Sequence, residues 1–103
     1  MPLKAAFTYH RTERRIPREI PVVLDGHGHT PGTETTFTEN VSAKGARVTS
    51  VRRWDKGESL TFASRTGEFR SSARVAYCQP LHGNGYAIGV EFLEPTGRWV
   101  VQS

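Results

Sequence analysis

The fold is decided by residues 68–94, which read EFRSSARVAYCQPLHGNGYAIGVEFLE. Apolar and polar side chains alternate in both halves of this stretch, and a period of two is the pattern of a strand with one buried and one solvated face. Between the halves, Gly83-Asn84-Gly85 is a hairpin-turn signal, because glycine adopts positive φ without strain. We therefore expect antiparallel strands over residues 68–78 and 86–94. Their predicted core side chains are Phe69, Ala73, Val75, Tyr77, Tyr86, Ile88, Val90 and Phe92.

Shorter segments before this hairpin alternate in the same way. Turn signals at Lys56-Gly57 and Thr66-Gly67, and a Gly- and His-rich stretch over residues 25–32, separate them. Six short strands joined by small turns fit a closed or nearly closed antiparallel barrel, in which closure removes exposed strand edges. The predicted fold is therefore an all-β, six-stranded barrel. Its four further strands are expected near residues 20–24, 33–38, 46–51 and 60–63.

Two segments lack strand alternation, at residues 1–19 and at residues 95–103. We expect residues 1–19 to form a flexible basic arm. The C-terminal tail is long enough for about two helical turns, with Trp99 and Val100 as candidates to plug one end of the barrel. The predicted organisation is a single domain in which the arm precedes a barrel over residues 20–103.

Composition excludes several classes of protein. The chain has 103 residues, of which 36% are hydrophobic and 23% charged, as in one globular domain with a modest core. No apolar run is long enough to span a bilayer, and the polar N-terminus lacks the apolar segment of a signal peptide. The single cysteine, Cys78, excludes an intramolecular disulfide framework. We expect a cytoplasmic protein that does not insert into membranes.

Basic residues are concentrated in the predicted arm. The formal net charge is +4, and residues 1–20 hold five of the 14 lysines and arginines. Four of these five are arginines, whose planar fork pairs with phosphate or with O6 and N7 of guanine and also stacks on bases. Pro17 and Pro21 keep the arm extended. Taken alone, the arm is either a solvated basic segment, the more frequent case, or a grip for an anionic partner.

A polar turn, ENVSAKGA at residues 39–46, leads into the strand expected near residues 46–51. Asn40 and Ser42 can direct their side chains to one side of a turn, and Gly45 permits another backbone to approach closely. Taken alone, the segment is an ordinary Asx-type turn.

Together, the arm and the turn resemble the signature of the PilZ family. Arg14-x-x-x-Arg18 precedes the first strand and Asn40-x-Ser42-x-x-Gly45 follows it, as in the family's R-x-x-x-R and [D/N]-x-S-x-x-G motifs. The resemblance extends to the ending IGVEFL at residues 88–93 and covers roughly residues 11–95. It implies a six-stranded antiparallel β-barrel that binds the bacterial second messenger cyclic di-GMP.

The resemblance also implies a role for each matching residue. Arg14 and Arg18 would grip phosphates and guanine Hoogsteen edges as the arm wraps the dinucleotide, and Arg15 would stack on a base or contact a phosphate. The turn would contribute Asn40 and Ser42 as hydrogen-bonding partners of a guanine and nearby polar atoms, and Gly45 as the residue that keeps the turn tight.

The register of the arginine pair has an alternative. Arg11 and Arg15 are also four residues apart, but the proline before Arg18 and the strand start at Ile20 favour Arg14 and Arg18. The motif's first turn position is Asn40 rather than aspartate, which removes a negative charge.

Other candidate sites are weaker. His27 and His29 have no cysteine or carboxylate at ligand spacing, so they form a poor metal site. Cys78 has no evident histidine or basic partner and is expected to be a small, semi-buried hydrophobe. No Ser-His-Asp set, acid–base carboxylate pair or phosphate-cradling loop stands out. We expect no catalysis and no metal or catalytic cofactor.

We therefore expect a receptor for cyclic di-GMP that passes the signal to an unidentified downstream protein and is a monomer or weak homodimer. No long nucleic acid is expected, because the excess charge is confined to a short arm. Two alternatives belong to other classes. One is a PilZ-like protein-interaction module that does not bind nucleotide. The other is a small barrel that binds single-stranded nucleic acid through its arm and exposed aromatic residues.

Overall fold

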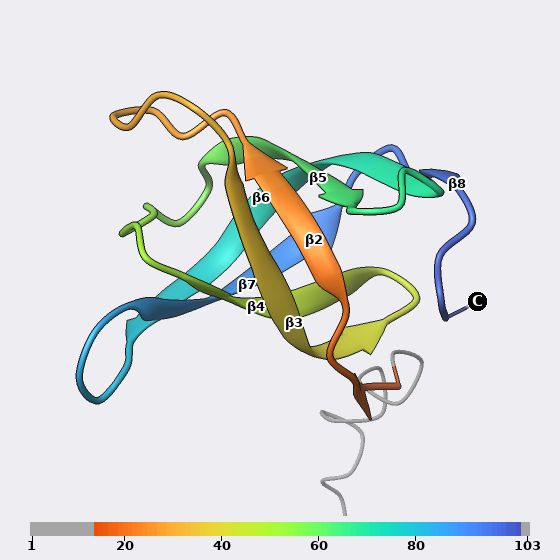
Figure 1. The fold of residues 1–103 in the computed structure, drawn as a ribbon, viewed down its shortest axis with the longest axis horizontal. Coiled ribbons are helices and arrows are strands. Elements are labelled where there is room, and N and C mark those ends of the chain that lie inside the picture. Colours follow the sequence, from red (N-terminus) through yellow and green to blue (C-terminus); the bar gives the residue numbers. More distant parts are fainter. Residues whose placement is uncertain (1–13, 102–103) are drawn as a thin grey trace, which may run out of the picture.

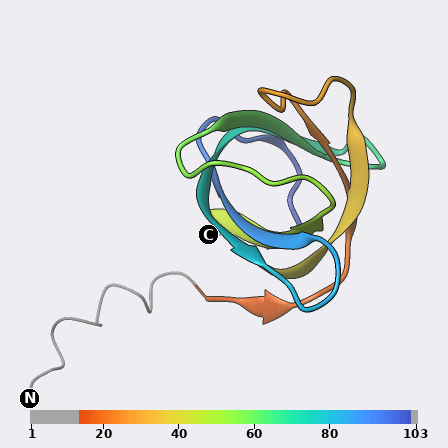
Figure 2. The same ribbon diagram turned by 90° about the vertical axis from the view of Figure 1, so that its left-hand side faces the viewer.

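Six strands close into an antiparallel barrel in the computed structural model, which describes residues 14–101 (Figures 1 and 2). Around the wall their order is β3, β2, β5, β6, β7 and β4, and pairing of β4 with β3 closes the ring. The predicted six-stranded barrel is confirmed. Its strands are β2 (Pro21–Asp25), β3 (Glu34–Ser42), β4 (Gly45–Ser50), β5 (Ser59–Ser64), β6 (Phe69–Pro80) and β7 (Tyr86–Phe92).

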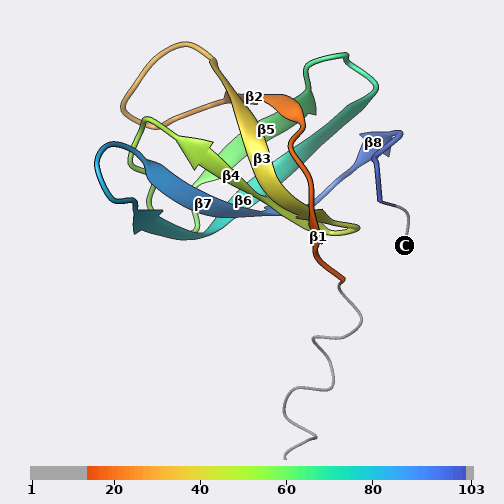
Figure 3. The same ribbon diagram turned by 60° about the horizontal axis from the view of Figure 1, so that its bottom comes forward.

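Two short strands lie outside the ring (Figure 3): β1 (Ile16–Pro17) pairs with β3, and β8 (Thr96–Gly97) pairs with β6. The expectation that the arm and the tail contain no strand was therefore wrong at these two places. Residues 1–13 of the predicted arm lie outside the described residues. Between residues 14 and 101 there is no helix, so none that could cross a membrane, and the tail does not form the helical turns considered for it.

The barrel interior is filled by the inward-facing residues of the strands, and a tryptophan closes each end. The indole N–H of Trp54 donates a hydrogen bond to the hydroxyl of Ser50, the last residue of β4. The indole N–H of Trp99 donates to the carbonyl oxygen of Ser42, which pairs with the first residue of β4. The prediction that Trp99 plugs a barrel end is confirmed by its 6% exposure, but Val100 is exposed. The aromatic rings packed around Trp99, with centroids 4.7 to 5.6 Å from it, belong to Phe62, Phe69 and Phe92.

Two β-bulges interrupt the alternation of inward and outward side chains. The pairing of β3 with β4 shifts between Thr38 and Asn40, and the pairing of β6 with β7 shifts between Val75 and Tyr77. A bulge inserts one residue, so side chains beyond it point to the opposite face from the one alternation predicts. Val75 faces the core, whereas Tyr77 lies on the outer surface opposite Gly89. The predicted core position of Tyr77 was wrong for this reason.

The remaining predicted core residues of β6 and β7 are buried, apart from Tyr86, which is half-buried at the start of β7. Inward and outward positions therefore follow the sequence pattern except beyond the bulges. The confirmed residues are Phe69, Ala73, Val75, Ile88, Val90 and Phe92.

Candidate functional site

One row of aligned residues crosses the outer surface of the barrel from β3 to β6. Strand pairing places Asn40 of β3 opposite Arg47 of β4, Arg47 opposite Gly89 of β7, and Gly89 opposite Tyr77 of β6. We call these residues the cross-strand row. On the other side of Asn40 lies Pro17 of β1. Directly opposed residues of paired strands are close enough to interact, so the row links the arm to the aromatic ring of Tyr77.

The arm meets the cross-strand row at Asn40. Nη1 of Arg15 donates a hydrogen bond of 2.9 Å to Oδ1 of Asn40. The backbone N–H of Arg18 donates to the carbonyl oxygen of Glu39 at 3.2 Å, on the other side of the short strand β1. These contacts hold the described part of the arm against the end of β3.

Arg47 is held by three neighbouring side chains. Its Nε donates to the Glu39 carboxylate at 2.8 Å, and its Nη1 donates to the Tyr77 hydroxyl at 3.1 Å and to Oε1 of Gln79 at 3.0 Å. The hydrogen bond to Glu39, followed by that to Tyr77, raises the pKa of Arg47 above its usual value. Alternation along β3 already places Glu39 on the surface, and the bulge brings Asn40 to the surface beside it.

Tyr77 lies over the only glycine of the cross-strand row. A Cβ added to Gly89 would collide with the Tyr77 ring, so a larger residue at this position would displace the aromatic side chain. The guanidinium carbon of Arg47 is 5.7 Å from the ring centre, a distance at which a cation is attracted to an aromatic face. The row thus combines an ordered cation with a partly exposed aromatic ring.

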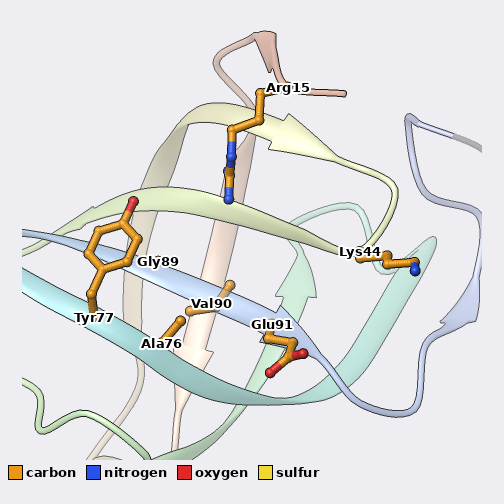
Figure 4. Close-up of a pocket in the computed structure, with 7 residues that line it drawn as sticks. All are labelled: Arg15, Lys44, Ala76, Tyr77, Gly89, Val90 and Glu91. Carbon is orange, nitrogen blue, oxygen red and sulfur yellow. The ribbon is translucent and has the colours of Figure 1, made fainter. Parts of the chain in front are cut away.

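An open pocket of about 260 Å³ lies between the arm and this part of the barrel wall (Figure 4). In Figure 4, the guanidinium of Arg15 extends from the arm toward β7, between Tyr77 and Lys44. The acid in the lining, Glu91, accepts a hydrogen bond of 2.8 Å from Arg74, which offsets its charge. The pocket is therefore suited to an anionic ligand. Its lining comprises Arg15, Lys44, Ala76, Tyr77, Gly89, Val90 and Glu91.

The arginines named by the sequence motif do not all face this pocket. Arg15 lines it, whereas Arg18 lines a second cleft together with Trp99 and Val100 of the tail. Arg14 is exposed and is not part of the pocket lining. In an extended segment, residues one apart point to opposite sides and residues four apart to the same side. The structure thus separates Arg15 from the Arg14 and Arg18 pair, and Arg11 lies outside the described residues.

The other motif residues shape the turn that borders the pocket. Ser42 is fully buried, where its Oγ accepts a hydrogen bond of 3.3 Å from the backbone N–H of Lys44. A Cβ added to Gly45 would collide with the carbonyl oxygen of Val90, so the close backbone approach predicted for this glycine is confirmed. Asn40 reaches the arm, while Ser42 and Gly45 position Lys44 at the edge of the pocket.

Three residues at or beside the pocket were missed by sequence reasoning. Alternation already placed Arg47 on the solvated face of its strand, so a search for cations next to the motif would have found it. Lys44 lies within the motif, between Ser42 and Gly45. The sequence did not indicate that Tyr77 lies at the pocket, because a strict period of two places its side chain in the core.

The remaining candidates have structural contacts. Both ring nitrogens of His27 are engaged: Nδ1 accepts hydrogen bonds of 3.0 Å from the backbone N–H groups of His29 and Thr30, and Nε2 is 2.8 Å from the carbonyl oxygen of Arg53. No cluster of three or more histidine, cysteine or acidic side chains within residues 14–101 could hold a metal ion. Cys78 is half-buried and packs against the core, as predicted.

Known proteins resemble this chain in sequence pattern and in fold. The family model described as the PilZ domain matches residues 9–98. The solved structure of the Bacillus subtilis inhibitor of motility, MotI/DgrA, has a TM-score of 0.69 and 20% identity, covering 84% of this chain and 44% of that one. The chain thus spans less than half the length of MotI/DgrA, and the likeness at this identity concerns the fold. No curated protein sequence matches the chain.

Proposed function

The chain belongs to the PilZ domain family, a family of cyclic di-GMP receptors, and we propose that it binds cyclic di-GMP between its arm and the cross-strand row. The observation that carries the proposal is the hydrogen bond of 2.9 Å from Arg15 to Asn40. This bond holds an arm arginine above a pocket whose wall includes Tyr77 and Gly89. The arm and the barrel wall are the two sides of the proposed site.

The chemistry of the pocket suits both parts of the ligand. Cyclic di-GMP contains phosphates and guanines, and arginine and lysine bind phosphate through charge-assisted hydrogen bonds. Arg15 and Lys44 supply these cations at the pocket. An aromatic ring offers a guanine a stacking surface, worth roughly 1–3 kcal/mol per base. Tyr77 therefore extends the set of ligand-binding residues beyond those of the sequence motif.

The size of the pocket supports a role for the rest of the arm. Its volume of about 260 Å³ lies just below the roughly 300–1,000 Å³ of small-molecule sites, which is small for a whole dinucleotide. We infer that one guanine and its neighbouring phosphate occupy the barrel side. Arg14 and Arg18 then close over the other half of the ligand. Moving the arm breaks its hydrogen bond to Asn40, which new charge-assisted hydrogen bonds to the ligand must offset.

The motif residues of the turn have distinct parts in this proposal. Asn40 accepts the hydrogen bond from Arg15 and offers its amide to a guanine when the arm rearranges. Ser42 and Gly45 keep Lys44 in place. The signal passes to a partner protein without catalysis. Arg18 lines a cleft beside Trp99 and Val100, so a rearrangement of the arm and the tail would present a changed surface to that partner.

Isothermal titration calorimetry with cyclic di-GMP tests the proposal, with GMP and a single-stranded oligonucleotide as control ligands. Arg15→Ala and Arg18→Ala should each weaken binding about tenfold or more, because each removes a charge-assisted contact worth roughly 1.5–3 kcal/mol. Arg70→Ala is the matched control, since Arg70 is an exposed arginine of β6 that does not line the pocket.

Two results would overturn the proposal. The first is the absence of binding heat with cyclic di-GMP at moderate salt. The second is tight oligonucleotide binding with a steep salt dependence, which would indicate a nucleic-acid-binding barrel. If cyclic di-GMP bound but neither Arg15→Ala nor Arg18→Ala changed its affinity, the function would stand and the proposed site would be wrong.

A further inference from the structure

Arg47 keeps one amino group outside the network that holds it. Its Nε and Nη1 atoms donate to Glu39, Tyr77 and Gln79. No acceptor for Nη2 is found among residues 14–101. The Arg47 side chain is 25% exposed, so part of it reaches the surface of the barrel.

The network fixes the direction of this amino group through contacts within the protein. Its acceptors come from both sides of Arg47, with Glu39 on β3 and both Tyr77 and Gln79 on β6. A long side chain that is already ordered loses little conformational entropy on binding, and a preorganised donor discriminates between ligands better than a mobile one.

Tyr77 defines where a base would lie relative to Arg47. One side of the ring covers Gly89, where a Cβ would collide with it, and the ring also lines the pocket. A purine base in the pocket would contact Tyr77 and lie near Arg47, whose guanidinium carbon is 5.7 Å from the centre of the Tyr77 ring.

We propose that Arg47 selects guanine over adenine for the base seated on Tyr77, through its unoccupied Nη2 donors. The inference rests on the proposed function, because it concerns a base of the nucleotide at the same pocket. An arginine N–H group can only donate a hydrogen bond. The Hoogsteen edge of guanine offers acceptors at O6 and N7, whereas adenine places an amino donor where guanine has O6. The Nη2 amino group of Arg47 and the amino group of adenine are both donors, so neither would find an acceptor when they face each other. The adenine nucleotide is therefore rejected.

The test compares the dissociation constants of cyclic di-GMP and cyclic di-AMP for the full chain and its variants. We expect the wild-type protein to favour cyclic di-GMP by about tenfold or more, a ratio within the range for one arginine–guanine contact. Arg47→Gln and Arg47→Lys should both reduce this ratio toward one, chiefly by weakening cyclic di-GMP. Gln79→Ala should reduce it less, because Gln79 only positions Arg47.

The matched control is Arg70→Gln, which removes the same charge from an exposed position of β6 and should leave both constants unchanged. Thermal unfolding of each variant identifies any that fails to fold, and Arg47→Lys retains the positive charge beside Glu39 if Arg47→Gln is unstable. A wild-type ratio of one, or a ratio unchanged in both Arg47 variants, overturns the inference.

The failure of this inference is distinguishable from the failure of the proposed function. If the wild-type protein bound neither cyclic dinucleotide, both would be overturned. If it bound cyclic di-GMP and lost affinity on Arg18→Ala, while both Arg47 variants kept the wild-type ratio, only the role of Arg47 would be wrong.

Discussion

The indole N–H of Trp99 donates a hydrogen bond of 2.8 Å to the carbonyl oxygen of Ser42, which ties the tail to the turn between β3 and β4. Trp99 plugs one end of the barrel, and the same turn places Lys44 at the edge of the pocket. The barrel plug and the wall of the candidate site are therefore parts of one packed unit. A change at either is expected to affect the other.

Replacing Trp99 tests this link through protein stability. Trp99→Phe keeps most of the apolar volume but leaves the buried Ser42 carbonyl without this donor, so we expect a loss of about 1–3 kcal/mol. Trp99→Ala also opens a cavity and should cost about 3–5 kcal/mol. Urea unfolding measures both values. Val100→Ala is the control, since Val100 is exposed and should change stability by less than about 0.5 kcal/mol. Wild-type stability of Trp99→Phe would contradict a stabilising role for the hydrogen bond.

Two glycines of the candidate site should respond differently to substitution by alanine. At Gly45 the added Cβ would collide with backbone, the carbonyl oxygen of Val90, so β4 and β7 must separate and stability should fall by about 2 kcal/mol or more. At Gly89 it would collide with the side chain of Tyr77, which can rotate away. Gly89→Ala should therefore cost less stability yet weaken cyclic di-GMP binding. Denaturant unfolding and calorimetry check the pair, and the opposite order of stabilities would contradict this assignment.

The pH dependence of stability should include a contribution from Glu58. Burial alone would raise the pKa of this carboxyl, but hydrogen bonds from the backbone N–H groups of Asp55 and Gly28, at 3.0 and 2.7 Å, lower it overall, helped by His27 and His29. Because the pKa in the folded state lies below its usual value, the stabilisation is present above about pH 4.5 and is lost as the pH falls through the folded-state value.

The variant Glu58→Gln isolates this contribution. Wild-type protein should be more stable than the variant near pH 6, and the difference should shrink as the pH falls below the usual glutamate pKa, because the carboxyl then becomes protonated in the folded chain as well. Unfolding free energies measured across this range provide the check. A difference that stays constant or grows on acidification would contradict the lowered pKa.

The strands were predictable from sequence because the barrel buries one face of each. Alternation identifies such strands without knowledge of their partners, as the burial of Val75, Val90 and Phe92 illustrates. Alternation also fails at a defined point. The bulge in β6 turns the Tyr77 side chain to the outer face, although the sequence around it keeps the same alternating pattern. Only the pairing register with β7 shows where the bulge lies.

The candidate site was predictable in part, for a related reason. The spacing of the motif identified Asn40 and Gly45, because the contacts of these two residues are set by the local turn and by the adjacent strand. The contact of Arg15 with Asn40 depends on the pairing of β1 with β3, and a two-residue strand is too short to show any period. Residues joined only by pairing between distant strands, such as Arg47 and Gln79, share no local pattern.

An NMR titration of the ¹⁵N-labelled chain shows whether cyclic di-GMP binds along the cross-strand row beneath the arm. We expect saturable shift changes concentrated at the amides of Asn40, Arg47 and Gly89 and at the arm arginines, with the amides around Trp54, at the opposite end of β4, largely unmoved. No shifts at saturating cyclic di-GMP, or shifts confined to the Trp54 end of the barrel, would contradict this expectation.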